Sequence, residues 1–540
     1  MSKRVAIVGA GCSGLTAIKC CLEEGLEPTC FERSNDIGGL WRFTNNTEEG
    51  RGSIYKSVVT NTSKEMMCFS DFPMPEEFPT YLHHSKVLEY LYLYAEHFSL
   101  LKYIHFQTEV CSVRKHPDFN SSGQWDVTTQ KQGEKTEAIF DAVIVSNGHF
   151  TDPCLPLESF PGIYDFKGGI IHSRTYKTPD NYHGKTVLVV GIGNSAADIA
   201  VELSHTAKQV FLSTREGSWV ISRISRNGFP VDMVLSRRWT LWVIHLLPRK
   251  LAAMINEKLM SQWFNHANYG LEPKNRMKIP IINDYIPSQI LQGAIQVKPN
   301  IKEFTETSVI FEDGTEAEKL DAVIFATGYH TTFPFLDDFT LKMDESNAPL
   351  YKNVFPVHVE KPTIAFLGLI QPLGPIMPTV ELQARWATRV FKGEAHLPPK
   401  REMENYIIKS MERKSKWFGI TKNLPLQTHY IDYVNELTVE IGNWPNLMYL
   451  FLTDPKLAWQ VVFGPCTPFQ YRLFGPGKWP GARKAILTQW DRTIKPNRTR
   501  IVHKNHDARP KIPSHLFWAF SAIISGIWFC SQYITPTNSL

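Results

Sequence analysis

The chain has 540 residues, of which 43% are apolar and 21% are charged, and this balance is typical of a globular protein with a buried core. Its net charge of +5 is small for this length, which argues against nucleic acid as a partner. The nine cysteines are odd in number and no pair has metal-ligand spacing, so we predict neither a metal site nor a disulfide framework.

The first predicted elements, near the N-terminus, are a buried apolar strand, a glycine turn and an amphipathic helix. Gly9 permits the tight turn, Gly11 lets the backbone approach a pyrophosphate, and Gly14 lets the helix pack closely on the strand. The pyrophosphate is expected at the N-terminus of the helix that begins near Ser13, where free N–H groups favour an anion. Glu32 ends the second strand, where a carboxylate accepts hydrogen bonds from ribose hydroxyls. The predicted contacts of this first dinucleotide are Gly9, Ala10, Gly11, Cys12, Ser13, Gly14 and Glu32.

Residues 187–215 repeat residues 5–33 without a gap, as a strand, a glycine turn, a helix and a second strand. Thr214 stands where the first copy has its acid, and Arg215 follows. Loss of the acid removes the repulsion that a 2′-phosphate would meet, so the second site is predicted to bind NADP and the first FAD or NAD. The residues that open the second helix also suit an ordinary N-cap. The predicted contacts of the second dinucleotide are Gly191, Gly193, Ser195, Ala196, Ala197, Asp198, Thr214 and Arg215.

Several further motifs resemble those of the flavin-containing monooxygenases, and the resemblance extends over essentially the whole chain. The clearest is the FxGxxxHxxxY pattern from Phe166 to Tyr176, which precedes the second nucleotide-binding repeat. His172 in this pattern is expected to support the hinge between the domains and not to act as an acid or base. Other matching segments are residues 38–41 (GGLW), 60–62 (TNT), 325–329 (FATGY), 381–386 and 464–492.

The resemblance implies an FAD- and NADPH-dependent monooxygenase of the dimethylaniline monooxygenase type. NADPH would reduce FAD, O2 would add to form a C4a-hydroperoxyflavin, and one oxygen atom would pass to a soft nitrogen or sulfur atom of a small lipophilic amine or sulfide. Asn61 would be the catalytic residue beside the reactive edge of the flavin, although an asparagine in a side-chain turn also explains it. The further cofactor contacts that the resemblance implies are Leu40, Trp41, Thr60, Asn61 and Thr62.

The sequence also bears on four other functions. Baeyer–Villiger oxidation of ketones stays open, although Tyr176 stands where that class usually has Trp. A weakly active paralogue acting as an NADPH oxidase, or a cofactor-binding scaffold without catalysis, also stays open. A disulfide reductase would need two cysteines in a CxxxxC motif after the first repeat, and only Cys68 lies there, so this function is rejected.

The repeats predict an α/β fold with two Rossmann-like dinucleotide-binding domains, for FAD and NADP, a helical insertion and a C-terminal membrane helix. The predicted segments are 1–155 and 330–445 for the two parts of the FAD-binding domain, 156–215 and 296–329 for the two parts of the NADP-binding domain, 216–295 for the helical insertion, 446–511 for a C-terminal extension towards the membrane, and 512–540 for the membrane anchor. Within the extension, the many glycines and prolines of residues 464–492 suggest more loop than helix.

The C-terminal residues predict attachment to a membrane. No Asp, Glu, Lys or Arg follows Lys511, and residues 516–534 are mostly apolar over the length that a bilayer core requires. The basic residues before this segment favour a cytosolic flank, so we predict a protein of the endoplasmic reticulum membrane with its catalytic domains facing the cytosol. A buried C-terminal helix is the alternative. Residues 239–247, between basic residues, suit either the membrane lipid interface or a core helix. The sequence is compatible with an oligomer.

Overall fold

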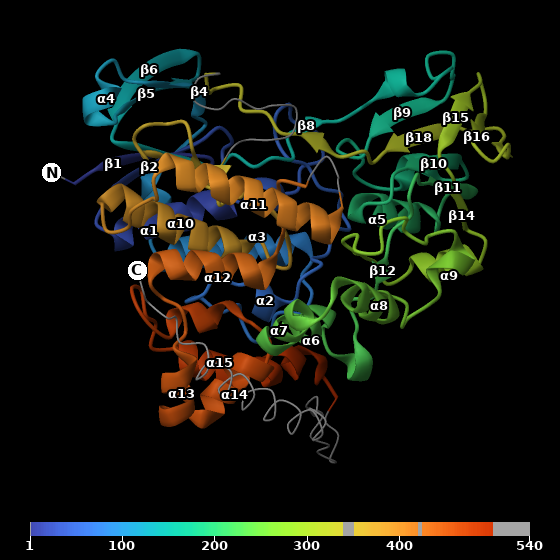
Figure 1. Ribbon diagram of the computed structural model, residues 1–540. Coiled ribbons are helices and arrows are strands. Elements are labelled where there is room, and N and C mark those ends of the chain that lie inside the picture. Colours follow the sequence, from blue (N-terminus) through green and yellow to red (C-terminus); the bar gives the residue numbers. More distant parts are fainter. Residues whose placement is uncertain (1, 338–349, 420–423, 501–540) are drawn as a thin grey trace, which may run out of the picture.

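Two parallel five-stranded sheets form the centre of the protein in the computed structural model, which describes residues 2–337, 350–419 and 424–500 (Figure 1). The first sheet has the strand order β22-β7-β1-β2-β3. Its central strand pairs in parallel with β2 on one side and β7 on the other. The elements are β1 (Arg4–Val8), α1 (Cys12–Glu23), β2 (Glu27–Glu32), β3 (Ile104–Phe106), β7 (Ala142–Val145) and β22 (Ile364–Phe366).

The second sheet repeats this arrangement, with the strand order β14-β11-β10-β18-β9. Its central strand β10 pairs in parallel with β11 and β18, as β1 does with β2 and β7. The elements are β9 (Gly169–His172), β10 (Thr186–Val190), α5 (Asn194–Leu203), β11 (Gln209–Ser213), β14 (Ile295–Lys298) and β18 (Ala322–Phe325). The prediction of an α/β fold with two Rossmann-like units is therefore confirmed.

The two sheets are interleaved in the chain. Strand β22 pairs with β7 through Ile364 and Val143, yet it follows every strand of the second sheet in the sequence. All four residues of β7 are buried, because a parallel sheet is covered on both faces. This burial explains why the central strands of the sequence are continuous apolar runs.

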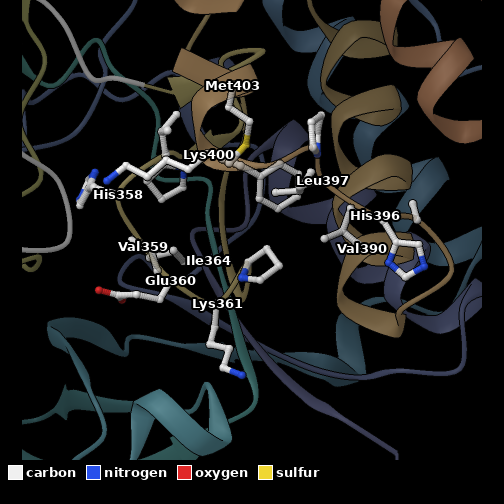
Figure 2. Close-up of a pocket in the computed structure, with 16 residues that line it drawn as sticks. His358, Val359, Glu360, Lys361, Ile364, Val390, His396, Leu397, Lys400 and Met403 are labelled. Atoms are coloured by element: carbon white, nitrogen blue, oxygen red, sulfur yellow. The ribbon is translucent and has the colours of Figure 1, made fainter. Parts of the chain in front are cut away.

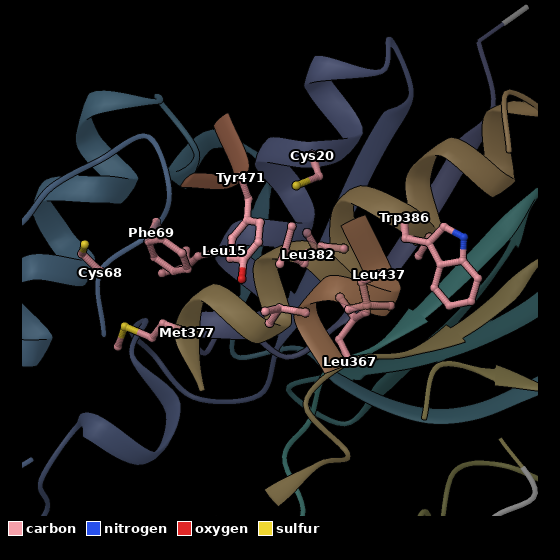
Figure 3. Close-up of a cluster of buried hydrophobic side chains, with 14 of the residues drawn as sticks. Leu15, Cys20, Cys68, Phe69, Leu367, Met377, Leu382, Trp386, Leu437 and Tyr471 are labelled. Atoms are coloured by element: carbon pink, nitrogen blue, oxygen red, sulfur yellow. The ribbon is translucent and has the colours of Figure 1, made fainter. Parts of the chain in front are cut away.

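Helices from distant parts of the chain cover the first sheet and share one apolar core (Figure 3). Leu15 of α1, Leu382 and Trp386 of α10 and Leu437 of α12 all have side chains less than 2% exposed. Tyr471, far along the chain, lies in the same cluster. The helices are α3 (His84–His97), α10 (Met377–Lys392), α11 (Lys400–Phe418) and α12 (Tyr430–Ile441).

Smaller elements surround the two sheets. Two antiparallel sheets comprise β4 (Glu109–Lys115), β5 (Trp125–Lys131) and β6 (Glu134–Phe140), and β15 (Ile301–Phe304), β16 (Val309–Phe311) and β17 (Glu316–Ala317). Between β11 and β14 the chain forms α6 (Val231–Leu235), α7 (Arg238–Leu246), α8 (Arg249–Met260) and α9 (Ile286–Leu291), with the short paired strands β12 (Val220–Ile221) and β13 (Ile281–Ile282).

Residues after 446 form α13 (Leu447–Thr453), α14 (Pro455–Phe463) and α15 (Ala482–Ile494). The expectation that residues 464–492 are more loop than helix is wrong for their second half. The glycines and prolines all precede Ala482, and the run of good helix formers after Gly481 continues without a breaker to Ile494.

Arg472 ties this C-terminal region to the first sheet's helices. Its guanidinium lies 2.7 Å from Glu381 of α10 and 2.9 Å from Asp71, and the side chains of Arg472 and Glu381 are 1% and 0% exposed. The oxygens of Glu381 also accept hydrogen bonds from the backbone N–H and the hydroxyl of Ser70. A buried charge is tolerated only when it is paired in this way.

No helix within residues 2–337, 350–419 and 424–500 is both long and apolar enough to cross a membrane. The predicted anchor at 512–540 lies outside the described residues.

Candidate functional site

The first glycine turn joins β1 to α1 and has the shape of a dinucleotide cradle. Gly9 has φ +97°, and a Cβ there would lie 3.0 Å from the carbonyl oxygen of Ser146. A Cβ on Gly14 would lie 1.9 Å from the carbonyl oxygen of Gly9, so only glycine permits this approach of helix to strand. Gly11 is the N-cap of α1 and no side chain caps the helix, so its first N–H groups suit a pyrophosphate. Cys12 and Ser13 begin this uncapped turn.

Glu32 and the GGLW turn close the same site. The carboxylate of Glu32 accepts hydrogen bonds from the backbone N–H groups of Ala10 (2.8 Å) and Ser34 (2.9 Å). The N–H of Gly38 donates to the carbonyl of Ala10, and a Cβ on Gly39 would lie 3.1 Å from the Cα of Gly11. The structure therefore brings the turn that carries Leu40 and Trp41 against the first glycine turn.

The second glycine turn joins β10 to α5 in the same way. Gly191 has φ +123°, and a Cβ there would lie 2.6 Å from the carbonyl oxygen of Ala326. Gly193 is the N-cap, without a side-chain cap, and a Cβ on it would meet no atom within 4 Å. Ser195 is exposed in the first helical turn, whereas Ala196 and Ala197 are fully buried against the sheet.

The other residues predicted for the second site have varied surroundings. The Thr214 hydroxyl accepts a hydrogen bond from the N–H of Gly217, and Arg215 is exposed beside it. The carboxylate of Asp198 accepts hydrogen bonds from the Tyr55 hydroxyl (2.7 Å) and from the Asn283 amide (2.8 Å). Burial raises the pKa of Asp198. Both oxygens of Asp198 are thus engaged by side chains of the protein.

Asn61 lies in the loop of residues 60–63, which contacts the segment between β11 and β14. Thr60 is 3% exposed, and it exchanges hydrogen bonds with Leu82, whose N–H donates to the threonine hydroxyl. Arg223, in the segment after β12, donates from Nη2 to Asn61 Oδ1 (2.7 Å) and from Nε to the carbonyl of Thr60 (3.1 Å). Thr62 follows, half-buried, in the same loop.

Asp232 of α6 holds the other end of this loop. One of its oxygens accepts hydrogen bonds from the backbone N–H (2.7 Å) and the hydroxyl (2.8 Å) of Ser63. Burial raises the pKa of Asp232 to about 6, against the hydrogen bonds from Ser63, which favour the charged form. The 60–63 loop is therefore held at both ends by residues of the segment between β11 and β14.

The sequence pattern did not reveal Arg223, Asp232 or Asp284 as residues of this site. Arg223 and Asp284 form an ion pair at 2.7 Å. No motif marks them, because a single charged residue in a polar segment has no periodic signal.

His172 ends β9 and supports the FATGY turn of residues 325–329. Its Nδ1 accepts a hydrogen bond from the N–H of Arg174 (3.1 Å), so Nε2 carries the proton and donates to the carbonyl of Gly328 (3.0 Å). Burial lowers the pKa of His172, which favours this neutral form. Both ring nitrogens of His172 are therefore occupied by hydrogen bonds with the protein backbone.

A cavity of about 440 Å³ lies elsewhere, between residues 355–364 and the start of α11 (Figure 2). None of the predicted site residues lines it. The side chains of Lys361, His396 and Lys400 point in different directions, so they do not converge on one ligand. The glycine turns are the candidate dinucleotide sites, because their helix N-termini have no side-chain cap and their glycines have no Cβ atom, which fits the pyrophosphates of FAD and NADPH.

Comparisons with known proteins agree with this geometry. The model of the family described as "Flavin-binding monooxygenase-like" matches residues 2–531. Dimethylaniline monooxygenase (N-oxide-forming) 2 of Cavia porcellus is 56% identical over 527 residues, which are 97% of this chain and 98% of that protein. Flavin-containing monooxygenase 2 of Homo sapiens is 58% identical, over 93% and 94%.

Among solved structures, S-allyl-L-cysteine S-oxygenase from Allium sativum superposes with a TM-score of 0.62 at 26% identity, over 85% of this chain and 95% of that one. The family match extends over both glycine turns and the 60–63 loop. The chain therefore belongs to the flavin-binding monooxygenase-like family and is a monooxygenase that uses FAD and NADPH.

Proposed function

We propose that the protein transfers one oxygen atom of O2 to soft nitrogen or sulfur atoms of small lipophilic amines and sulfides. One structural observation carries the proposal: residues 55–63 touch the second dinucleotide helix through Tyr55 and present Asn61 beside Arg223. This segment thus connects the second dinucleotide helix with the loop that carries Asn61. The names of the relatives, an N-oxide-forming enzyme and an S-oxygenase, support this substrate class.

The residues bind and position, and the bound cofactor carries the difficult step. Reduced flavin supplies the activation of O2 for transfer of a single oxygen atom. The first glycine turn and Glu32 are proposed to hold FAD, and the second turn, with Thr214 and Arg215, to hold NADPH. Asn61 is proposed as the catalytic residue, with Leu40, Trp41, Thr60 and Thr62 around it. The two interleaved sheets support the proposed division into an FAD-binding domain in two parts and an inserted NADP-binding domain.

Product analysis of the purified holoenzyme tests the function. N,N-dimethylaniline and methyl phenyl sulfide should yield an N-oxide and a sulfoxide, with one NADPH consumed for each product, as measured by mass spectrometry and absorbance at 340 nm. Cyclohexanone, a ketone, is tested in parallel as a substrate for Baeyer–Villiger oxidation. A lactone as the main product would favour Baeyer–Villiger oxidation. NADPH consumption that yields only hydrogen peroxide with every substrate would favour an NADPH oxidase.

We also propose that the protein lies on the endoplasmic reticulum membrane with its catalytic domains in the cytosol. Four residues of α8 form an exposed apolar stripe at helical spacing, namely Leu251, Met254, Ile255 and Leu259. Met448 and Leu452 of α13 are 76% and 82% exposed. Exposed apolar helices flanked by basic residues suit the lipid interface.

Removal of residues 512–540 tests the attachment. The truncated protein should keep FAD and leave the microsomal pellet in part, with release completed at high salt or by Met254→Ser with Leu259→Ser. An intact chain that stays in the supernatant without detergent would refute the membrane proposal.

A further inference from the structure

The orientation of the Asn61 side chain is fixed by its partner. Arg223 Nη2 lies 2.7 Å from Asn61 Oδ1. A guanidinium has only donors, so the asparagine must turn its carbonyl oxygen towards Arg223. The two N–H groups of Asn61 Nδ2 then face the other way, and among the described residues no side chain or carbonyl accepts a hydrogen bond from them. They are donors available to a bound group.

Arg223 is itself held in place on every side. Its Nη1 donates to Asp284 Oδ2 (2.7 Å), and its backbone N–H donates to Asp284 Oδ1 (2.8 Å). The hydroxyl of Tyr81 donates to the carbonyl of Arg223, and the Tyr81 ring lies under the guanidinium at 5.9 Å. The side chains of Arg223 and Asp284 are 11% and 19% exposed, so solvent screens the pair little.

The same network continues into the second dinucleotide helix. Asn283, which precedes Asp284, is 2% exposed and donates from Nδ2 to Asp198 of α5 (2.8 Å). Its Oδ1 accepts the backbone N–H of Ile286, the first residue of α9. These hydrogen bonds, together with the peptide bond between Asn283 and Asp284, therefore connect α5 with Arg223 and Asn61.

We propose that Arg223 is a positioning residue, which orients the Asn61 amide so that its N–H groups face the reacting atoms, and that Asp284 fixes Arg223 relative to the NADP-binding helix. The inference rests on the proposed role of Asn61. Arg223 acts through Asn61, so its loss matters only while the asparagine is present. The loop itself is also held by Asp232 through Ser63, so removal of the arginine side chain leaves its backbone supported.

Four variants of the full-length holoenzyme test the proposal: Asn61→Ala, Asn61→Asp, Arg223→Gln and the double variant Asn61→Ala with Arg223→Gln. Two quantities are measured. One is the rate of anaerobic reduction of FAD by NADPH, and the other is the share of NADPH that yields hydrogen peroxide in place of oxygenated N,N-dimethylaniline. Arg483→Gln, which breaks the exposed ion pair with Asp454, is the matched control.

Loss of one oriented hydrogen bond should lower the product formed per NADPH by about tenfold. Arg223→Gln should show this loss while FAD reduction changes less than about twofold, since a general folding defect would lower both. Asn61→Asp keeps an acceptor for Arg223 but has no N–H, so it should be as uncoupled as Asn61→Ala. Arg483→Gln should match the parent.

The double variant distinguishes an effect of Arg223 through Asn61 from a direct effect of Arg223 on the reaction. If Arg223 acts through Asn61, the double variant couples no worse than Asn61→Ala alone. An additional tenfold loss would mean that Arg223 acts on the reaction directly, and full coupling in Arg223→Gln or Asn61→Asp would also overturn the inference. Full coupling in Asn61→Ala would instead refute the proposed function of Asn61.

Discussion

Replacement of Gly14 by alanine should weaken FAD binding, because the first glycine turn leaves no space for a methyl group. A Cβ there would lie 1.9 Å from the carbonyl oxygen of Gly9, about 1.5 Å inside the 3.4 Å at which ordinary contact begins. The two nearest atoms, the carbonyl oxygen and carbonyl carbon of Gly9, belong to the main chain, so α1 must move away from β1. Overpacking of this kind costs roughly 1–3 kcal/mol or more. Since about 1.4 kcal/mol is a tenfold change in Kd, FAD affinity should fall by about fivefold to about 150-fold.

The assay is the ratio of flavin to protein absorbance after purification, followed by FAD titration of the apoprotein. Gly193→Ala is the matched control in the second turn, where φ is −83° and a Cβ meets no atom within 4 Å. This variant should retain FAD but show a higher KM for NADPH, because its methyl group occupies the approach of the proposed pyrophosphate. A Gly14→Ala protein that binds FAD as tightly as the parent would refute the steric argument.

Three further predictions concern the second cofactor, the buried charges and pH. Thr214→Glu should raise the KM for NADPH more than that for NADH by repelling the 2′-phosphate; equal KM changes for both would count against the proposed site. Arg472→Met leaves the buried Glu381 without its cation and should lower the free energy of unfolding by about 3–5 kcal/mol, partly restored by adding Glu381→Gln; an unchanged thermal midpoint would contradict this. Because burial raises the pKa of Asp232 to about 6, its ionisation costs stability as pH rises from about 4 to about 6. Asp232→Asn should remove that loss, so its unfolding midpoint relative to the parent should increase over this range.

The sequence by itself determined the two nucleotide-binding units and the residues of their turns. A strand, a glycine turn and a helix are local, and their periodicity and glycine positions can be read within about thirty residues. For the same reason Gly9, Gly14 and Gly191 could be assigned to turns that the structure contains. The absence of an acid at Thr214 was likewise visible without coordinates. The composition of residues 464–492 does not reveal the helix at 482–494, because the glycines and prolines in the first part of that range suggest loop for the whole range.

Only the tertiary structure decided what surrounds Asn61. Arg223 is 162 residues away in the chain, and Asp232 is 169 residues from Ser63. The pairing of Arg472 with Glu381 likewise spans 91 residues. Each such contact depends on how two domains and the segment between them pack, and a lone charged residue has no pattern that reveals its distant partner. Local sequence therefore determines the glycine turns, whereas long-range packing determines which side chains contact Asn61.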